Sequence, residues 1–117
     1  MLCLAHPSYH DYEGVALDLD ERERLIRDLG GKFMMMLRNH GVLTAGKDVA
    51  ETFTYLYFLM KACEIQVKAQ SCGPLHMPSK QAVRTTAEQS QSLGSATALT
   101  WPALLRLLDS KNSGYAV

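Results

Sequence analysis

The sequence predicts an α/β fold that combines two or three strands with three or four helices. The apolar run at residues 33–37 has the length of a strand and follows a glycine pair, which is typical of a strand buried on both faces. Residues 49–70 place apolar side chains every three or four positions, which is the period of a helix. Because the chain has 117 residues, we expect a single domain over residues 1–117 with a small core.

The first part of the chain is predicted to hold one helix between less regular segments. Residues 1–8 form an irregular start, and residues 13–18 favour a strand only weakly. Asp20 is a candidate N-cap, and Glu23, three positions later, completes a capping box. The glycine pair at 30–31 then ends the helix, because glycine adopts the left-handed conformation of a helix C-terminus at little cost.

The middle of the chain is predicted to continue with strands and the longest helix. Residues 42–44 extend or partner the strand at 33–37. Asp48 and Glu51 form an N-cap and N3 acidic pair, which marks a helix start. The apolar stripe of this helix consists of Val49, Phe53, Leu56, Met60, Cys63 and Val67. Residues 71–80 are a loop, because their two prolines cannot sit inside a continuing helix.

The last third is predicted to contain a polar segment and a final helix. Residues 79–91 are rich in Ala, Gln, Thr and Ser and are expected to form a weakly packed helix or a flexible arm. Thr100 is a candidate N-cap for the final helix, with Pro102 in its first turn, where the missing amide hydrogen costs nothing. Residues 111–117 are a tail.

Two groups of side chains that could suggest binding are interpreted as structural. The methionines at 34–36 and the aromatic residues at 53–58 are expected to fill the core, with the long helix covered on both sides, rather than to line a ligand groove. The helix after Asp20 also carries interleaved charges, at Glu21, Arg22, Glu23, Arg24, Arg27 and Asp28. We interpret these charges as a solvated helix face.

Composition excludes several classes of partner and compartment. Equal numbers of acidic and basic residues give a formal net charge of zero, without a basic stripe, so we expect no nucleic-acid partner. The most apolar stretch is shorter than the roughly 20 residues that a membrane span needs, so no membrane partner is expected. The low charge favours self-association as a homo-oligomer. The cysteines at 3, 63 and 72 lack C-x-x-C spacing and no secretion signal is recognisable, which predicts a reduced, cytoplasmic protein.

The sharpest local motif is Asn39-His40-Gly41 at the end of the predicted buried strand. A neutral imidazole at this position can ligate a metal ion, and the glycine lets the backbone turn closely around it. The alternative is a histidine that satisfies its hydrogen bonds within a turn. Spacing alone leaves both interpretations open and favours the second.

Several segments resemble the class II aldolase/adducin family, including its adducin-like bacterial members. They are Met-Leu-Arg-Asn-His-Gly-Val-Leu-Thr-Ala-Gly-Lys at 36–47, the flanking residues at 49–53 and 62–66, Tyr-His-Asp-Tyr-Glu-Gly at 9–14 with the helix at 21–24, and Trp-Pro-Ala-Leu-Leu at 101–105. Together they cover nearly all of residues 9–109. The resemblance implies a partial αβα fold that corresponds to the central and C-terminal part of the family domain.

The resemblance also implies a metal site that this chain completes only in part. In metal-dependent members, the histidine of the N-H-G motif, here His40, is one of three that hold a divalent ion, usually zinc. An H-x-H pair and a catalytic acid lie upstream of it. The chain has neither feature, so it resembles an N-terminally truncated copy. A catalytic zinc needs about three protein ligands and one open position, so we expect no catalytic residue here and no tight metal binding by this chain alone.

His6 and His10 are the accessory candidates for completing a site with His40. They are four positions apart, which would place them on one face of a helix, but Pro7 disfavours helical geometry at His6. A preformed site of all three is therefore the less favoured alternative. His76, between two prolines, is interpreted as a solvated loop residue.

Two functional hypotheses follow from the resemblance. The first is an inactive relative of metal-dependent carbon–carbon lyases that act on small hydroxy-carbonyl compounds, which would bind substrate only if the site were completed. The second is a non-catalytic, adducin-like module for oligomerisation or assembly. Whether the chain is an enzyme stays open at this point, because fold alone does not determine function.

Overall fold

The computed structural model describes residues 6–14, 19–91, 94–112 and 114. The elements within these residues are β1 (Ser8–His10), α1 (Leu19–Leu29), β2 (Met34–Leu37), β3 (Gly41–Thr44), α2 (Val49–Ser71), α3 (Lys80–Gln91) and α4 (Gly94–Lys111). This composition confirms the predicted α/β class. Within the described ranges no helix is long and apolar enough to cross a membrane.

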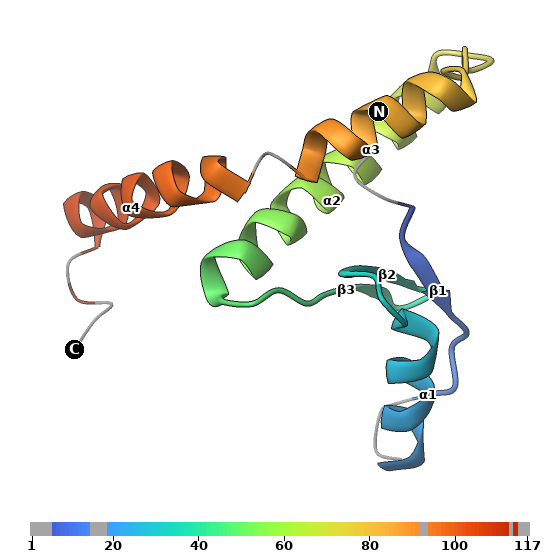
Figure 1. Ribbon diagram of the computed structural model, residues 1–117, viewed down its shortest axis with the longest axis horizontal. Helices are drawn as coiled ribbons and strands as arrows, with labels where there is room; N and C mark the ends of the chain where they lie inside the picture. Colours follow the sequence, from blue (N-terminus) through green and yellow to red (C-terminus); the bar gives the residue numbers. More distant parts are fainter. Residues whose placement is uncertain (1–5, 15–18, 92–93, 113, 115–117) are drawn as a thin grey trace.

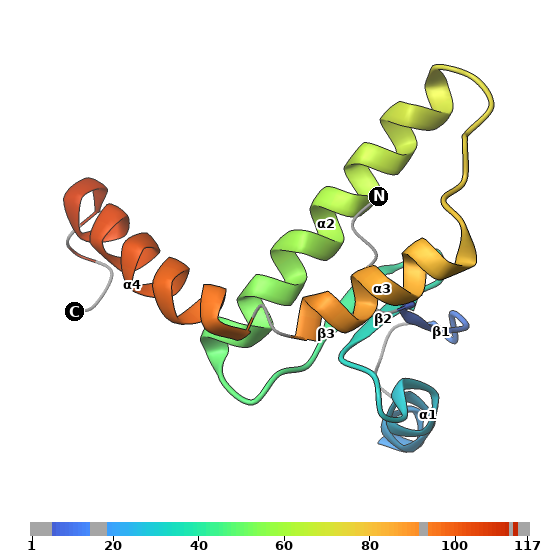
Figure 2. The same ribbon diagram turned by 45° about the horizontal axis from the view of Figure 1, so that its top comes forward.

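The three strands form one small sheet in the order β1-β2-β3 (Figure 1). β1 runs parallel to β2, with His10 opposite Leu37, and β2 runs antiparallel to β3. α1 connects the two parallel strands, as such a connection requires a crossover. α1 and α2 lie on opposite sides of the sheet in both ribbon views, which gives the αβα layering that the resemblance implied (Figures 1 and 2).

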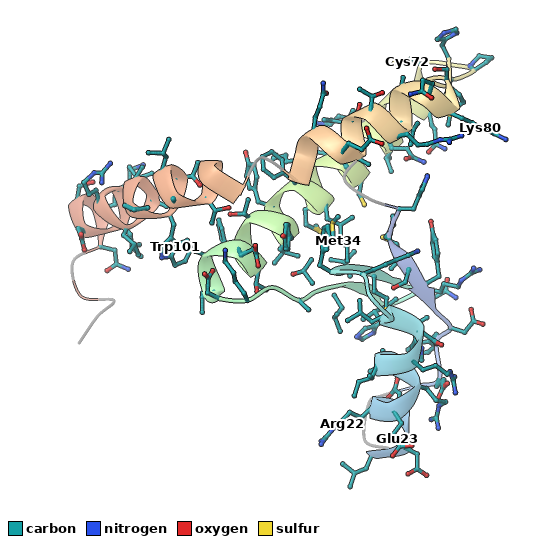
Figure 3. The ribbon with its side chains drawn as sticks, in the orientation of Figure 1. Arg22, Glu23, Met34, Cys72, Lys80 and Trp101 are labelled. Carbon is teal, nitrogen blue, oxygen red and sulfur yellow. The ribbon has the colours of Figure 1, made fainter. Side chains whose placement is uncertain are left out.

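The core lies between the sheet and α2. Met34 and Met35 are 2% and 0% exposed, and Leu59 of α2 is 7% exposed. Figure 3 shows Met34 between the sheet and α2. Phe33 and Tyr55 extend this contact, because their rings stack with centroids 4.4 Å apart. The prediction that the methionines at 34–36 fill the core is therefore confirmed for Met34 and Met35, whereas Met36 is only partly buried.

The apolar stripe predicted for α2 lies on the wrong side of the helix. Val49, Met60 and Val67 are 72%, 53% and 66% exposed, whereas Leu59 carries the contact with the sheet. The helix is apolar around most of its circumference, so periodicity alone could not tell which face the sheet covers. Phe53 and Tyr57 are also exposed, and the expected cover on both sides of α2 is absent among the described residues.

The chain is open rather than compact. Its radius of gyration is 16.7 Å, compared with about 13 Å expected for a compact domain of similar length. Figure 2 shows α3 separated from α2 and α4 extending away from the sheet. α4 contacts the start of α2, where the rings of Phe53 and Trp101 lie 5.5 Å apart.

Of the predicted helix ends, those at Asp48 and Gly30 are confirmed and two predicted N-caps are wrong. Asp48 caps α2 as predicted, because its side chain accepts a hydrogen bond of 2.8 Å from the amide of Glu51. Gly30 has a φ of 56° at the end of α1, also as predicted. The caps predicted at Asp20 and Thr100 are wrong, because α1 already begins at Leu19 and α4 at Gly94.

The strand predictions near the N-terminus also need correction. Ser8–His10 is a strand, although residues 1–8 were expected to be irregular throughout. Its short polar sequence has no alternation of apolar residues, so no pattern indicated it. Glu13 and Gly14 are not in a strand, and the rest of the weak strand predicted at 13–18 lies outside the described residues.

Candidate functional site

The turn between β2 and β3 presents the predicted ligand His40. The amide of His40 donates a hydrogen bond of 3.1 Å to the carbonyl of Leu37, which closes the turn. Asn39 has a φ of 58°, a left-handed conformation that Asn tolerates better than most other residues. The His40 ring is exposed and stacks on Tyr12 with centroids 5.9 Å apart. The imidazole is therefore accessible to a ligand.

Arg38 joins this turn to the end of β1. Its amide donates a hydrogen bond of 3.0 Å to the carbonyl of His10. Its guanidinium lies 5.2 Å from the centre of the Tyr9 ring and pairs with Asp11 at 3.2 Å. A cation above an aromatic face is attracted by the electrons of the ring. These contacts fix the turn that carries His40 relative to β1.

A small cavity of about 80 Å³ lies beside this turn. Its walls include His10, Tyr12, Glu21, Arg38 and His40. The volume is well below the roughly 300–1,000 Å³ typical of sites for larger organic ligands. The cavity therefore has room only for a few water molecules, an ion or one end of a small molecule.

His10 forms the buried end of this cavity. Its side chain is 4% exposed, and its Nδ1 lies 2.8 Å from Oδ2 of Asp28. On the other side of the ring, Nε2 lies 3.7 Å from Oε1 of Glu21 and has no hydrogen-bond partner among the described residues. The hydrogen bond from His10 lowers the pKa of Asp28 below its usual range. Asp28 is therefore ionised at neutral pH.

The interpretation of the charged side chains of α1 as a solvated helix face is wrong for two carboxylates. Glu21 is 8% exposed and Asp28 binds His10. Both lie on one face of α1, seven positions apart, because seven residues make about two helical turns. The spacing of Glu21 and Asp28 on one helix face can be recognised in the sequence. Nothing in the sequence, however, predicted that His10 lies opposite these two carboxylates. Among the other charges of α1, Arg24 pairs with Glu13 near the surface.

The structure brings two of the predicted ligands, His40 and His10, to one cavity. His6 is exposed and outside regular structure, and His76 is exposed in the loop before α3. His6 and His10 are not on a helix, as the proline between them predicted. No group of three or more His, Cys, Asp or Glu side chains in the described ranges is arranged to hold a metal ion.

A second, apolar groove of about 410 Å³ runs between α2 and α4. Phe53, Tyr57 and Phe58 of α2 form one wall, and Leu104 and Leu107 of α4 form the other. This part of α2 was expected to be covered core rather than a groove. Sequence reasoning missed it because the local pattern does not show how α4 lies against α2, where Trp101 packs on Phe53.

Comparison with known proteins gives consistent matches over most of the chain. Residues 2–67 match the family described as "Class II Aldolase and Adducin N-terminal domain". A protein of Caulobacter vibrioides named "Putative aldolase class 2 protein" is 42% identical over 99% of this chain and 46% of its own length. Rat alpha-adducin is 35% identical over 97% of this chain, which is 17% of that protein.

A solved structure has the same fold. The crystal structure of an aldolase II superfamily protein from Pseudomonas syringae superposes with a TM-score of 0.84 and 45% sequence identity. The match covers 92% of this chain and 45% of that protein. The chain thus spans less than half the length of the bacterial relatives that it matches.

Proposed function

We propose a function on the premise that the chain belongs to the class II aldolase and adducin family. We infer that it carries one part of a metal-dependent, lyase-like centre for small hydroxy-carbonyl compounds and does not catalyse alone. In this proposal His40 is a ligand of zinc or another divalent ion, and His6 and His10 are the accessory candidates. The cysteine pattern supports a cytoplasmic location.

The observation that carries the proposal is the position of His40. The turn holds it at the end of β2 beside the cavity, with an exposed ring and a backbone fixed by Leu37 and His10. A strand end on a rigid sheet is a precise place for a functional side chain. When bound, a divalent ion would polarise the oxygen of a carbonyl substrate.

The donor set of the chain does not fit a complete catalytic zinc site. Such a site needs about three protein ligands, and the described residues offer no group of three. We therefore expect no turnover by this chain alone and derive no reaction step from it. In this proposal the further donors come from a region that the relatives, which are more than twice as long, have in addition.

Complementation tests this proposal. The 117-residue chain is mixed with the part of the Caulobacter vibrioides protein that lies outside the matched region. We expect the mixture to bind one equivalent of Zn²⁺ more than the chain alone and to release aldehyde from a panel of small hydroxy-ketones, and the chain alone to release none. His40→Ala should remove both properties, whereas His76→Ala, as a matched surface control, should keep them. Metal-dependent turnover by the chain alone, or an unchanged His40→Ala mixture, would contradict the proposal.

A second candidate function is an adducin-like assembly module that forms homo-oligomers. The specific observation in its favour is the apolar surface of α2 and α4, which includes Phe53, Tyr57 and Leu107 at 41%, 52% and 49% exposure. Apolar surface of this kind self-associates when little net charge opposes it. Sedimentation at micromolar concentration should show a dimer or larger species that Tyr57→Lys disperses. A strictly monomeric wild-type chain would exclude this function.

A further inference from the structure

The most informative unused feature is the unpaired nitrogen of His10. Nδ1 lies 2.8 Å from Oδ2 of Asp28, so Nδ1 is the ring nitrogen that donates a hydrogen bond to this carboxylate. Nε2 is then the ring nitrogen left to bind a ligand. Nε2 faces Oε1 of Glu21 at 3.7 Å, inside the fold. A cation between Nε2 and Oε1 would give both atoms a partner.

The distance between Nε2 of His10 and Oε1 of Glu21 distinguishes a bridging proton from a bridging metal ion. A hydrogen bond between nitrogen and oxygen spans about 2.7–3.2 Å, which is shorter than the observed 3.7 Å. A divalent ion such as zinc binds imidazole nitrogen and carboxylate oxygen at about 2.0–2.2 Å each, so the two ligand atoms lie roughly 3.0–4.0 Å apart. The observed separation falls inside this second range.

We propose that His10 and Glu21 bind one divalent cation, with Asp28 as the outer carboxylate that orients the imidazole. A carboxylate on the second nitrogen of a ligating histidine fixes the tautomer and makes the ring a better ligand. The cavity bordered by His10 and Glu21 supplies space for the remaining ligands, which are water or oxygen atoms of a bound molecule. This pair differs from His40, since Glu21 and Asp28 come from α1.

This inference deepens the proposed function and rests on it only for the role of the shared cavity. Only two protein side chains supply ligands, so the affinity is expected to be lower than at a site with three. The ion would also neutralise the carboxylate of Glu21, which is 8% exposed. Binding should therefore stabilise α1 against β1.

The direct test uses Mn²⁺ alone and the wild-type chain. Paramagnetic Mn²⁺ broadens the NMR signals of a nearby imidazole, and the exposed His76 serves as a control within the same molecule. We expect the His10 ring signals to broaden first, at substoichiometric Mn²⁺. Broadening of all histidines to the same degree would overturn the proposal. So would a His10 ring that stays sharp and carries protons on both nitrogens at neutral pH.

Variants separate this site from the one at His40. In calorimetric titration with Zn²⁺, Glu21→Gln should weaken binding more than tenfold, and Asp28→Asn should weaken it about 10- to 100-fold, as is typical for outer carboxylates. The surface control Glu88→Gln should change the affinity less than about twofold. Loss of binding in His40→Ala with full binding in Glu21→Gln would overturn this inference and leave the proposed role of His40 intact. The Mn²⁺ measurement decides the question if Glu21→Gln does not fold.

Discussion

The two ends of the molecule differ in how they are held together. Between residues 8 and 35, five side chains are buried: Ser8, His10, Glu21, Met34 and Met35. Beyond Leu59, none of the described residues is buried. The sheet and α1 thus contain most of the buried side chains, while α3 and α4 expose most of the apolar side chains that the structure describes.

The comparison teaches that the candidate site and the candidate assembly surface depend on different parts of the chain. His40 and His10 are fixed by strand pairing and by Arg38, all within residues 8–44. The apolar groove depends on α4, which touches the rest of the fold mainly at Trp101. A change in one region should therefore leave the other largely intact, since distant sites without shared partners contribute almost independently.

The largest expected effect comes from the core of the sheet. Met35→Ala removes a side chain that is 0% exposed and should lower the free energy of unfolding by about 2–5 kcal/mol. Met60→Ala, in which the side chain is 53% exposed, is the matched control and should cost less than about 1 kcal/mol. Urea denaturation followed by circular dichroism measures both. Equal losses would contradict the assignment of the core to β2.

The turn that carries His40 should be the next most sensitive position. Asn39 adopts a φ of 58°, and Asn39→Ala should cost about 1–2 kcal/mol because alanine is strained in this conformation. Asn39→Gly should be close to neutral, because glycine adopts it freely. Thermal unfolding of the two variants compares them directly. A stable alanine variant would mean that the turn does not hold His40 as described.

A smaller effect is expected at the contact between α2 and α4. Trp101→Ala removes the ring that packs on Phe53, and an aromatic pair of this kind contributes about 0.5–1.5 kcal/mol beyond its buried area. Hydrogen exchange should become faster in α4 and stay unchanged in β2 and β3. Leu99→Ala, at a side chain that is 77% exposed, is the control. Faster exchange in the sheet would show that the two regions are coupled.

The smallest effect concerns the two surface ion pairs that Glu64 of α2 forms with Lys61 and Lys68. Lys61 and Lys68 lower the pKa of Glu64 from 4.5 to about 2. A carboxyl with a lowered pKa stabilises the fold above its ordinary pKa and loses this contribution as the pH falls towards the lowered value. Glu64→Gln should therefore lower the melting temperature slightly at pH 7, and the difference should shrink from pH 4.5 to pH 2. High salt should reduce it at pH 7.

The sequence predicted the features that depend on short-range chemistry. The cap at Asp48, the glycine stop at Gly30 and the apolar strand before His40 were all found. Each arises from a few neighbouring residues, so the local pattern contains the necessary information. The family resemblance was confirmed as well, because the motif around His40 lies within the matched residues.

The features that were missed depend on contacts between distant residues. The exposed face of α2 could not be predicted, since both faces are apolar and only the sheet selects one. Glu21 and Asp28 appeared to be ordinary surface charges until β1 placed His10 between them. Thr100 was mistaken for a cap because α4 continues through Pro102, and a local signal does not show where the preceding turns begin.

Native-state hydrogen exchange of the whole chain tests most directly the difference between the buried sheet and the exposed C-terminal helices. The account predicts strong protection of the amides in β2 and β3, intermediate protection in the middle of α2, and little protection in α3, because protection follows local burial and contact density. Protection in α3 equal to that in β2 would contradict it. Such a result would mean that the C-terminal helices are held as firmly as the sheet that carries His40.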